Sequence, residues 1–146
     1  MLDCTGAIGV EGTWMLSLME KAVDASGARR VHSHNEDFDG SVSPPGFASV
    51  VLLDESHVTA HCYSETGLLA VDAFSCGGTD PARIMEEIEK ELKSRYPEME
   101  INRRKRVERF LSEPVNGGVR GFVDRHFQHF NAGALRDCAQ SLDKFL

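Results

Sequence analysis

Residues 47–75 read FASVVLLDESHVTAHCYSETGLLAVDAFS, and this stretch decides the fold. Its β-branched, aromatic and aliphatic residues gather in three runs, at 47–53, 57–63 and 68–75. Such runs favour β-strands, and the links between them, Asp54-Glu55-Ser56 and Glu65-Thr66-Gly67, are short and polar. Strands joined this closely pair with their neighbours along the chain, so the stretch predicts an antiparallel meander.

Two helices flank this meander in the sequence. Thr13 is the expected N-cap of the first, whose apolar residues recur every four positions up to a C-cap signal at Gly27. The second is expected to begin with Asp80 as N-cap and Pro81 in the first turn, and to end before Pro97. A third helix is predicted in the tail, where three residues follow helical spacing: Leu135, Cys138 and Leu142.

Weaker patterns complete the sheet. A strand is expected at 30–34, followed by an irregular loop at 35–46 that carries Pro44-Pro45-Gly46. Further strands are expected within 1–8 and at 99–107. This order of elements predicts an α+β fold, a two-layer α/β sandwich with a mainly antiparallel sheet and its helices on one face. At 146 residues the chain is expected to form a single domain, residues 1–146.

Composition excludes several classes of function. A formal net charge of -7 argues against a nucleic-acid partner, because phosphate binding depends on accumulated Lys and Arg. The basic run at 103–106 is interpreted as a solvated face. No apolar run is long enough to span a bilayer, so we expect no membrane partner and a cytoplasmic location. Four cysteines lie far apart without a CxxC pair, which is typical of reduced thiols: Cys4, Cys62, Cys76 and Cys138.

One face of the central strand is polar. Every second position carries a polar or titratable side chain: His57, Thr59, His61 and Tyr63. An exposed face of an open sheet, an active site, or a face covered by a partner would each explain this pattern. Ser56 suits a hydrolytic triad by residue type, but no GxSxG turn surrounds it. A metal site is a weak alternative, because its candidate ligands lack a recognisable loop: His32, His34, Glu36 and Asp37.

The residues around Ser56 resemble a known motif. The step ESHVTAH at 55–61, followed by Glu65 and by LLAVDAFSCGG with Cys76, is similar to the prokaryotic S-adenosylmethionine decarboxylase proenzymes. The similarity is clearest from Phe47 to Arg95. It implies a self-processing, pyruvoyl-dependent decarboxylase that supplies decarboxylated S-adenosylmethionine for spermidine biosynthesis. It also implies a homodimer in which the uncovered sheet faces of two copies meet as an αββα sandwich, with active sites at the interface.

The resemblance also implies the chemistry. Attack of the Ser56 hydroxyl on the Glu55 carbonyl would give an ester, whose elimination and hydrolysis would leave a pyruvoyl group at residue 56. The products would be a β chain of residues 1–55 and an α chain of residues 56–146, with no external cofactor. The ketone would form a Schiff base with the substrate and accept electrons as carbon dioxide leaves. By family analogy, His61 assists processing and Cys76 donates a proton to the substrate carbon.

The resemblance is less direct about substrate binding and substrate identity. Glu65 matches the family's ribose-binding acid, and Tyr63 and Phe38 are the expected aromatic contacts. The family serine eight positions before the cleavage serine falls on Ala48, and Ser49 can replace it only if a bulge turns it to the other face. L-arginine or L-ornithine decarboxylation therefore stays an alternative, and a non-catalytic regulatory relative is another. Three acidic residues would attract an activating polyamine: Glu36, Asp37 and Asp39.

Overall fold

The computed structural model describes residues 1–54, 56–76 and 78–109. The chain divides into two compact units, Met1–Arg106 and Val107–Leu146, and all the helices and strands given below belong to the first. The predicted third helix, at Leu135, Cys138 and Leu142, lies outside the described residues, and so does the predicted cleavage residue Glu55.

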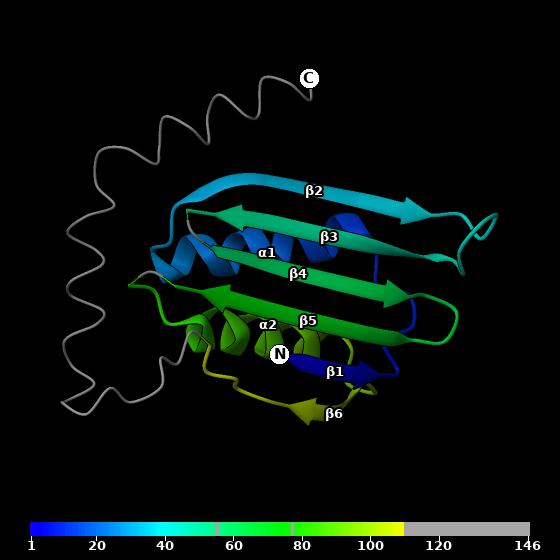
Figure 1. Ribbon diagram of the computed structural model, residues 1–146. Coiled ribbons are helices and arrows are strands. Elements are labelled where there is room, and N and C mark those ends of the chain that lie inside the picture. Colours follow the sequence, from blue (N-terminus) through cyan, green and yellow to red (C-terminus); the bar gives the residue numbers. More distant parts are fainter. Residues whose placement is uncertain (55, 77, 110–146) are drawn as a thin grey trace, which may run out of the picture. The chain divides into compact units, whose positions relative to one another are not determined.

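A six-stranded sheet forms one layer of this unit, and two helices form the other (Figure 1). The strands follow the order β2-β3-β4-β5-β1-β6, and each neighbouring pair is antiparallel. The predicted α+β class with an antiparallel sheet is confirmed. The strands are β1 Leu2–Thr5, β2 Arg30–Phe38, β3 Gly46–Leu53, β4 Ser56–Tyr63, β5 Leu68–Ser75 and β6 Glu100–Arg104, and the helices are α1 Gly12–Ser26 and α2 Pro81–Arg95.

The predicted meander is formed by β3, β4 and β5. The β3–β4 register continues without a shift from Gly46 opposite Tyr63 to Leu53 opposite Ser56, and the β4–β5 ladder is equally regular. Because successive side chains in a strand point to opposite faces, the even-numbered residues of β4 pack against the helices: Val58, Ala60 and Cys62 are buried. The polar odd-numbered positions therefore lie on the face without helices, as the sequence predicted.

The edge strand β2 is longer than the sequence predicted. It continues from the expected 30–34 segment to Phe38, so the assignment of residues 35–38 to a loop was wrong. Their polar side chains have partners that the sequence pattern does not display. On the helix side Asn35 contacts Ser49 of β3 and Asp37 of its own strand, while the backbone stays paired with β3. A polar strand forms here because these partners satisfy the hydrogen-bonding groups of its side chains and backbone.

At the opposite edge, β6 spans only Glu100–Arg104, so the predicted strand at 99–107 was too long. The basic run that begins in this strand is surrounded by carboxylates. Arg103 contacts Asp3, Arg104 contacts Glu86 and Glu89, and Arg106 contacts Asp80, all with arginine side chains more than half exposed. The run is therefore a paired surface of the protein, in agreement with its interpretation as a solvated face.

The predicted helix boundaries agree with the structure except at the start of α1. α1 begins at Gly12 with Glu11 as the N-cap residue, so the predicted N-cap at Thr13 was wrong. Gly27 ends α1 in the left-handed conformation, with a φ of 79°. The predicted cap of α2 is confirmed, because Asp80 Oδ1 accepts a hydrogen bond from the Ala82 amide at 3.0 Å.

Both helices cover the same face of the sheet (Figure 1). Their apolar stripes and the inward side chains of the strands form one core, whose largest fully buried members include Phe47, Leu2, Met15, Met19, Leu69, Ile84, Ile88 and Leu92. The other face of the sheet carries no helix of the described unit. Among the described residues, no helix has the length and apolar character needed to cross a membrane.

Candidate active site

The open face of the sheet is organised in rows of cross-strand neighbours. The register of β2, β3, β4 and β5 aligns four such rows: His32–Leu52–His57–Phe74, His34–Val50–Thr59–Asp72, Glu36–Ala48–His61–Ala70 and Phe38–Gly46–Tyr63–Leu68. Side chains within a row stand about 5 Å apart, and those in adjacent rows are still within reach of long side chains. The sheet thus brings histidines, carboxylates and aromatic rings from four strands onto one surface.

An aromatic cluster occupies one end of this surface. The His61 ring lies 5.6 Å from the Phe38 ring and 4.9 Å from the Tyr63 ring, measured between centroids. Glu65 follows in the exposed turn after β4. The structure therefore brings together His61, Tyr63 and Phe38, which sequence reasoning had assigned separately, and places Glu65 at the same end of the sheet.

Ser56 and Cys76 lie at the other end. Ser56 is the first residue of β4, and its Oγ accepts a hydrogen bond from the backbone N–H of Cys76 at 3.3 Å. Cys76 is exposed, whereas Cys4 and Cys62 are buried free thiols. Burial, with the nearby Asp3 carboxylate, raises the pKa of Cys4 to about 11, and burial raises the pKa of Cys62. Cys76 is thus the accessible thiol among these three, beside Ser56.

Within one chain the structure does not bring His61 to Ser56. His61 is five positions along the extended strand from Ser56, a distance of about 16 Å at 3.3 Å per residue. Alternation also turns their side chains to opposite faces, since His61 lies with the exposed odd-numbered residues of β4. The predicted processing serine and its expected helper therefore lie toward opposite ends of the same strand.

Ser49 cannot take the place of the missing family serine in this geometry. It is 2% exposed and faces the helices, where its Oγ donates a hydrogen bond to Asn35 Oδ1 at 2.7 Å. The uninterrupted β3–β4 register contains no bulge that would turn it over. Ala48 is the residue opposite His61 on the open face.

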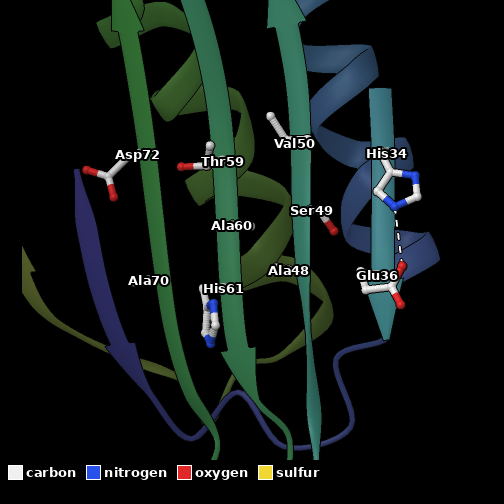
Figure 2. Close-up of a pocket in the computed structure, with 10 residues that line it drawn as sticks. All are labelled: His34, Glu36, Ala48, Ser49, Val50, Thr59, Ala60, His61, Ala70 and Asp72. Atoms are coloured by element: carbon white, nitrogen blue, oxygen red, sulfur yellow. Dashed lines mark hydrogen bonds and ion pairs between the residues drawn. The ribbon is translucent and has the colours of Figure 1, made fainter. Parts of the chain in front are cut away.

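A hollow of about 370 Å³ lies in the middle of the open face (Figure 2). Space for the hollow is left because Ala48 and Ala70, on either side of His61, carry only methyl groups. Asp72 reaches it from β5 and was not assigned a role by the sequence, although alternation along β5 places it on the same face as Phe74. The full lining is His34, Glu36, Ala48, Ser49, Val50, Thr59, Ala60, His61, Ala70 and Asp72.

The acidic and histidine residues of β2 separate onto two faces. His34 and Glu36 lie on the open face, where His34 Nε2 and Glu36 Oε2 are 3.3 Å apart (Figure 2). Asp37 points to the helix side, where it accepts a hydrogen bond from Asn35. Within residues 1–54, 56–76 and 78–109, no three His, Cys, Asp or Glu side chains are grouped as metal ligands.

Comparison with known proteins identifies the family. The S-adenosylmethionine decarboxylase family profile matches residues 1–132. The chain belongs to this family. The resemblance read from the motif around Ser56 is thereby confirmed.

Three curated members of the family illustrate the degree of similarity, each an S-adenosylmethionine decarboxylase proenzyme. The protein from Sulfurihydrogenibium sp. (strain YO3AOP1) is 35% identical over 89 residues, which cover 60% of this chain and 64% of that protein. The protein from Persephonella marina is 39% identical over 77 residues, covering 52% and 55%. Proenzyme 2 of Bacillus cereus is 36% identical over 96 residues, covering 65% and 71%. The chain thus spans less than two thirds of the length of the first two relatives.

Among solved structures, the adenosylmethionine decarboxylase from Aquifex aeolicus VF5 matches with a TM-score of 0.49 at 23% identity. The match covers 77% of this chain and 93% of that one.

Proposed function

We propose that this chain is a self-processing, pyruvoyl-dependent decarboxylase of S-adenosylmethionine, which acts in the cytoplasm and supplies decarboxylated S-adenosylmethionine for spermidine biosynthesis. The observation that carries the proposal is the 3.3 Å hydrogen bond from the Cys76 amide to Ser56 Oγ, in a chain of the S-adenosylmethionine decarboxylase family. It sets the expected cofactor precursor beside the expected proton donor. The names of the curated relatives support the choice of substrate.

Self-cleavage uses atoms of the chain and one water molecule. Ser56 Oγ bonds to the carbonyl carbon of Glu55 as the peptide C–N bond breaks, and the hydroxyl proton passes to the freed amine. Removal of the Ser56 α-proton then breaks the Cβ–Oγ bond, and the β chain 1–55 leaves with a terminal carboxylate. The dehydroalanine left at position 56 takes up water and releases ammonia. The α chain 56–146 then begins with a pyruvoyl group.

The residues around Ser56 fit this group. Ser56 is half-buried at the start of a strand, and the Cys76 amide that donates to its Oγ lies beside the position where the ketone would form. The pyruvoyl ketone supplies an electron sink for the loss of carbon dioxide. Cys76 has an exposed side chain next to this position, so we assign its thiol as the proton donor to the substrate carbon. Tyr63, Phe38 and Glu65 are assigned to the nucleoside end of the substrate.

The separation of Ser56 from His61 supports a homodimer with shared sites. A two-fold axis that runs across the strands, between two open faces, would place the Ser56 end of each sheet over the His61 end of the other. The open face also carries exposed apolar side chains that such pairing would cover, since Leu52, Leu68 and Tyr63 are 42%, 46% and 36% exposed. We therefore propose an αββα dimer in which His61 serves Ser56 of the partner chain.

Intact mass under denaturing conditions tests the proposal. The purified protein should give two chains split between residues 55 and 56, the larger with a pyruvoyl N-terminus. Ser56→Ala should stay whole and inactive, whereas Cys76→Ala should still cut itself and then release carbon dioxide slowly. A wild-type chain that remains whole after prolonged incubation would remove the basis of the proposal.

The substrate is tested separately. Release of labelled carbon dioxide is measured in parallel from S-adenosylmethionine, L-arginine and L-ornithine with the self-cleaved protein. Activity confined to S-adenosylmethionine is expected. Activity confined to arginine or ornithine would be consistent with the proposed pyruvoyl mechanism, but it would show that the proposed substrate is wrong.

A further inference from the structure

His61 stands in the centre of a row with unusually small neighbours. The β3–β4 and β4–β5 registers place Ala48 and Ala70 directly beside it, and the β2–β3 register places Glu36 beyond Ala48. Glu36 and His61 are thus two strand spacings apart, about 9.6 Å between backbones. Only a methyl group stands between them, and this is where the hollow of the open face lies (Figure 2). Two long side chains leaning toward each other can meet across such a gap.

The other groups that face His61 are less suited to hold it. Asp3 lies beyond Ala70 in the same row, but its carboxylate pairs with Arg103 at 3.5 Å. Asp72 belongs to the adjacent row, opposite Thr59. The remaining titratable or aromatic neighbours on this face come from β2 and β4: His34, Phe38, His57 and Tyr63.

Glu36 itself is held by a neighbour. Its Oε2 lies 3.3 Å from His34 Nε2, on the same face of β2. A carboxylate has a second oxygen that can accept another hydrogen bond. Both side chains are exposed in the single chain, 59% for His34 and 67% for Glu36, so a change of rotamer that carries the carboxylate over Ala48 is rapid. Covering the open face with a second copy would strengthen the contact by excluding water.

From this geometry we propose that Glu36 is a positioning residue for His61. Its carboxylate accepts a hydrogen bond from one ring nitrogen of His61 across the methyl of Ala48. That bond fixes the ring and its tautomer, and it leaves the second nitrogen free to move a proton during self-cleavage. The inference rests on the proposed function, because it gives His61 a supporting residue in that reaction.

The first experiment determines the ring tautomer of His61 in a chain that cannot cut itself. In the Ser56→Ala protein, long-range ¹H–¹⁵N NMR spectra of His61 should show one ring tautomer, and adding Glu36→Ala should give a mixture. Glu36→Gln, which keeps an acceptor oxygen, should preserve more of the single tautomer than Glu36→Ala does. An identical His61 signal in all three proteins would overturn the proposal, whether or not the wild-type chain cuts itself.

The rate of self-cleavage is read second. Glu36→Ala should slow it about tenfold, since a misplaced acid–base group loses part of its contribution. Ala48→Val, which closes the gap but keeps the carboxylate, should slow it similarly. Ala70→Val is the matched control on the other side of His61 and should cut at nearly the wild-type rate.

Equal slowing by Ala48→Val and Ala70→Val would instead show that crowding of the open face is responsible, and the proposal would be wrong. Unchanged cutting by Glu36→Ala would contradict it directly. A wild-type chain that never cuts would count against the proposed function alone, because the NMR comparison still decides the contact between Glu36 and His61.

Discussion

The Ser49 hydroxyl is expected to stabilise the fold and to have no role in the candidate active site. It is buried between β3 and α1 and donates to Asn35 Oδ1 at 2.7 Å. Ser49→Ala removes this donor, so we expect the free energy of unfolding to fall by about 1 kcal/mol. Self-cleavage should keep its rate, because the side chain faces away from His61. Urea denaturation and intact mass check the two parts, and loss of cutting in a folded Ser49→Ala protein would return Ser49 to the active site.

Cys4 gives the protein a pH dependence in the alkaline range. Burial is the main cause that raises the pKa of this thiol from 9.0 to about 11 in the folded chain. Above about pH 9 the unfolded chain therefore loses a proton that the folded chain keeps, and the stability present at lower pH is lost as the pH rises toward 11. In Cys4→Ala the free energy of unfolding should fall less steeply as the pH rises over this range. Urea unfolding of both proteins at pH 8 and pH 10.5 measures the difference, and parallel curves would contradict this role of Cys4.

The resemblance of one continuous stretch to a family motif was sufficient to name Ser56, His61, Glu65 and Cys76 as candidates. It was not sufficient for Asp72 or for Glu36 as a neighbour of His61. Those placements depend on which residue of β2 or β5 lies opposite which residue of β3 or β4. Register is a property of paired strands and not of a single segment, so a local pattern cannot reveal it.

At the scale of the elements, the start of β3 depends on a glycine. A Cβ on Gly46 would overlap the carbonyl oxygen of Cys62 on β4. We therefore expect Gly46→Ala to lower the free energy of unfolding by about 2 kcal/mol or more, because neighbouring strands must move apart. Gly78 is the matched control, since a Cβ there meets nothing within 4 Å. Urea denaturation of both variants should separate them clearly, and equal stabilities would mean that β3 tolerates the methyl group.

The strands of the meander and the second helix could be predicted because each is marked by a pattern within its own segment of sequence. Alternation places Val58, Ala60 and Cys62 in the core, and Asp80 with Pro81 marks the start of α2. The second half of β2 could not be predicted in this way. Residues 35–37 are polar on both faces and precede a loop with prolines. Only their pairing with β3, together with the hydrogen bond from Ser49 to Asn35, shows why they are extended.

At the scale of the whole molecule, the open face of the sheet is both an unpaired surface and the place where the predicted functional residues collect. Helices cover the other face, and the groups proposed for self-cleavage, Ser56 and His61, lie toward opposite ends of β4. A single chain would have to bend this strand sharply to join them. In the proposed dimer the His61 end of a second copy would lie over the Ser56 end of the first, so we expect self-cleavage to depend on assembly.

Mixed dimers test this dependence. Two variant chains, Ser56→Ala and His61→Ala, carry different affinity tags. Each should remain whole when it is expressed alone. Co-expressed and purified through both tags, they form one site with Ser56 from the His61→Ala chain and His61 from the Ser56→Ala chain. We therefore expect the His61→Ala chain to be cut in the mixed protein and the Ser56→Ala chain to stay whole. Intact mass reads both chains at once. If the His61→Ala chain also stays whole in verified mixed dimers, His61 acts within its own chain, and the sheet must rearrange for self-cleavage.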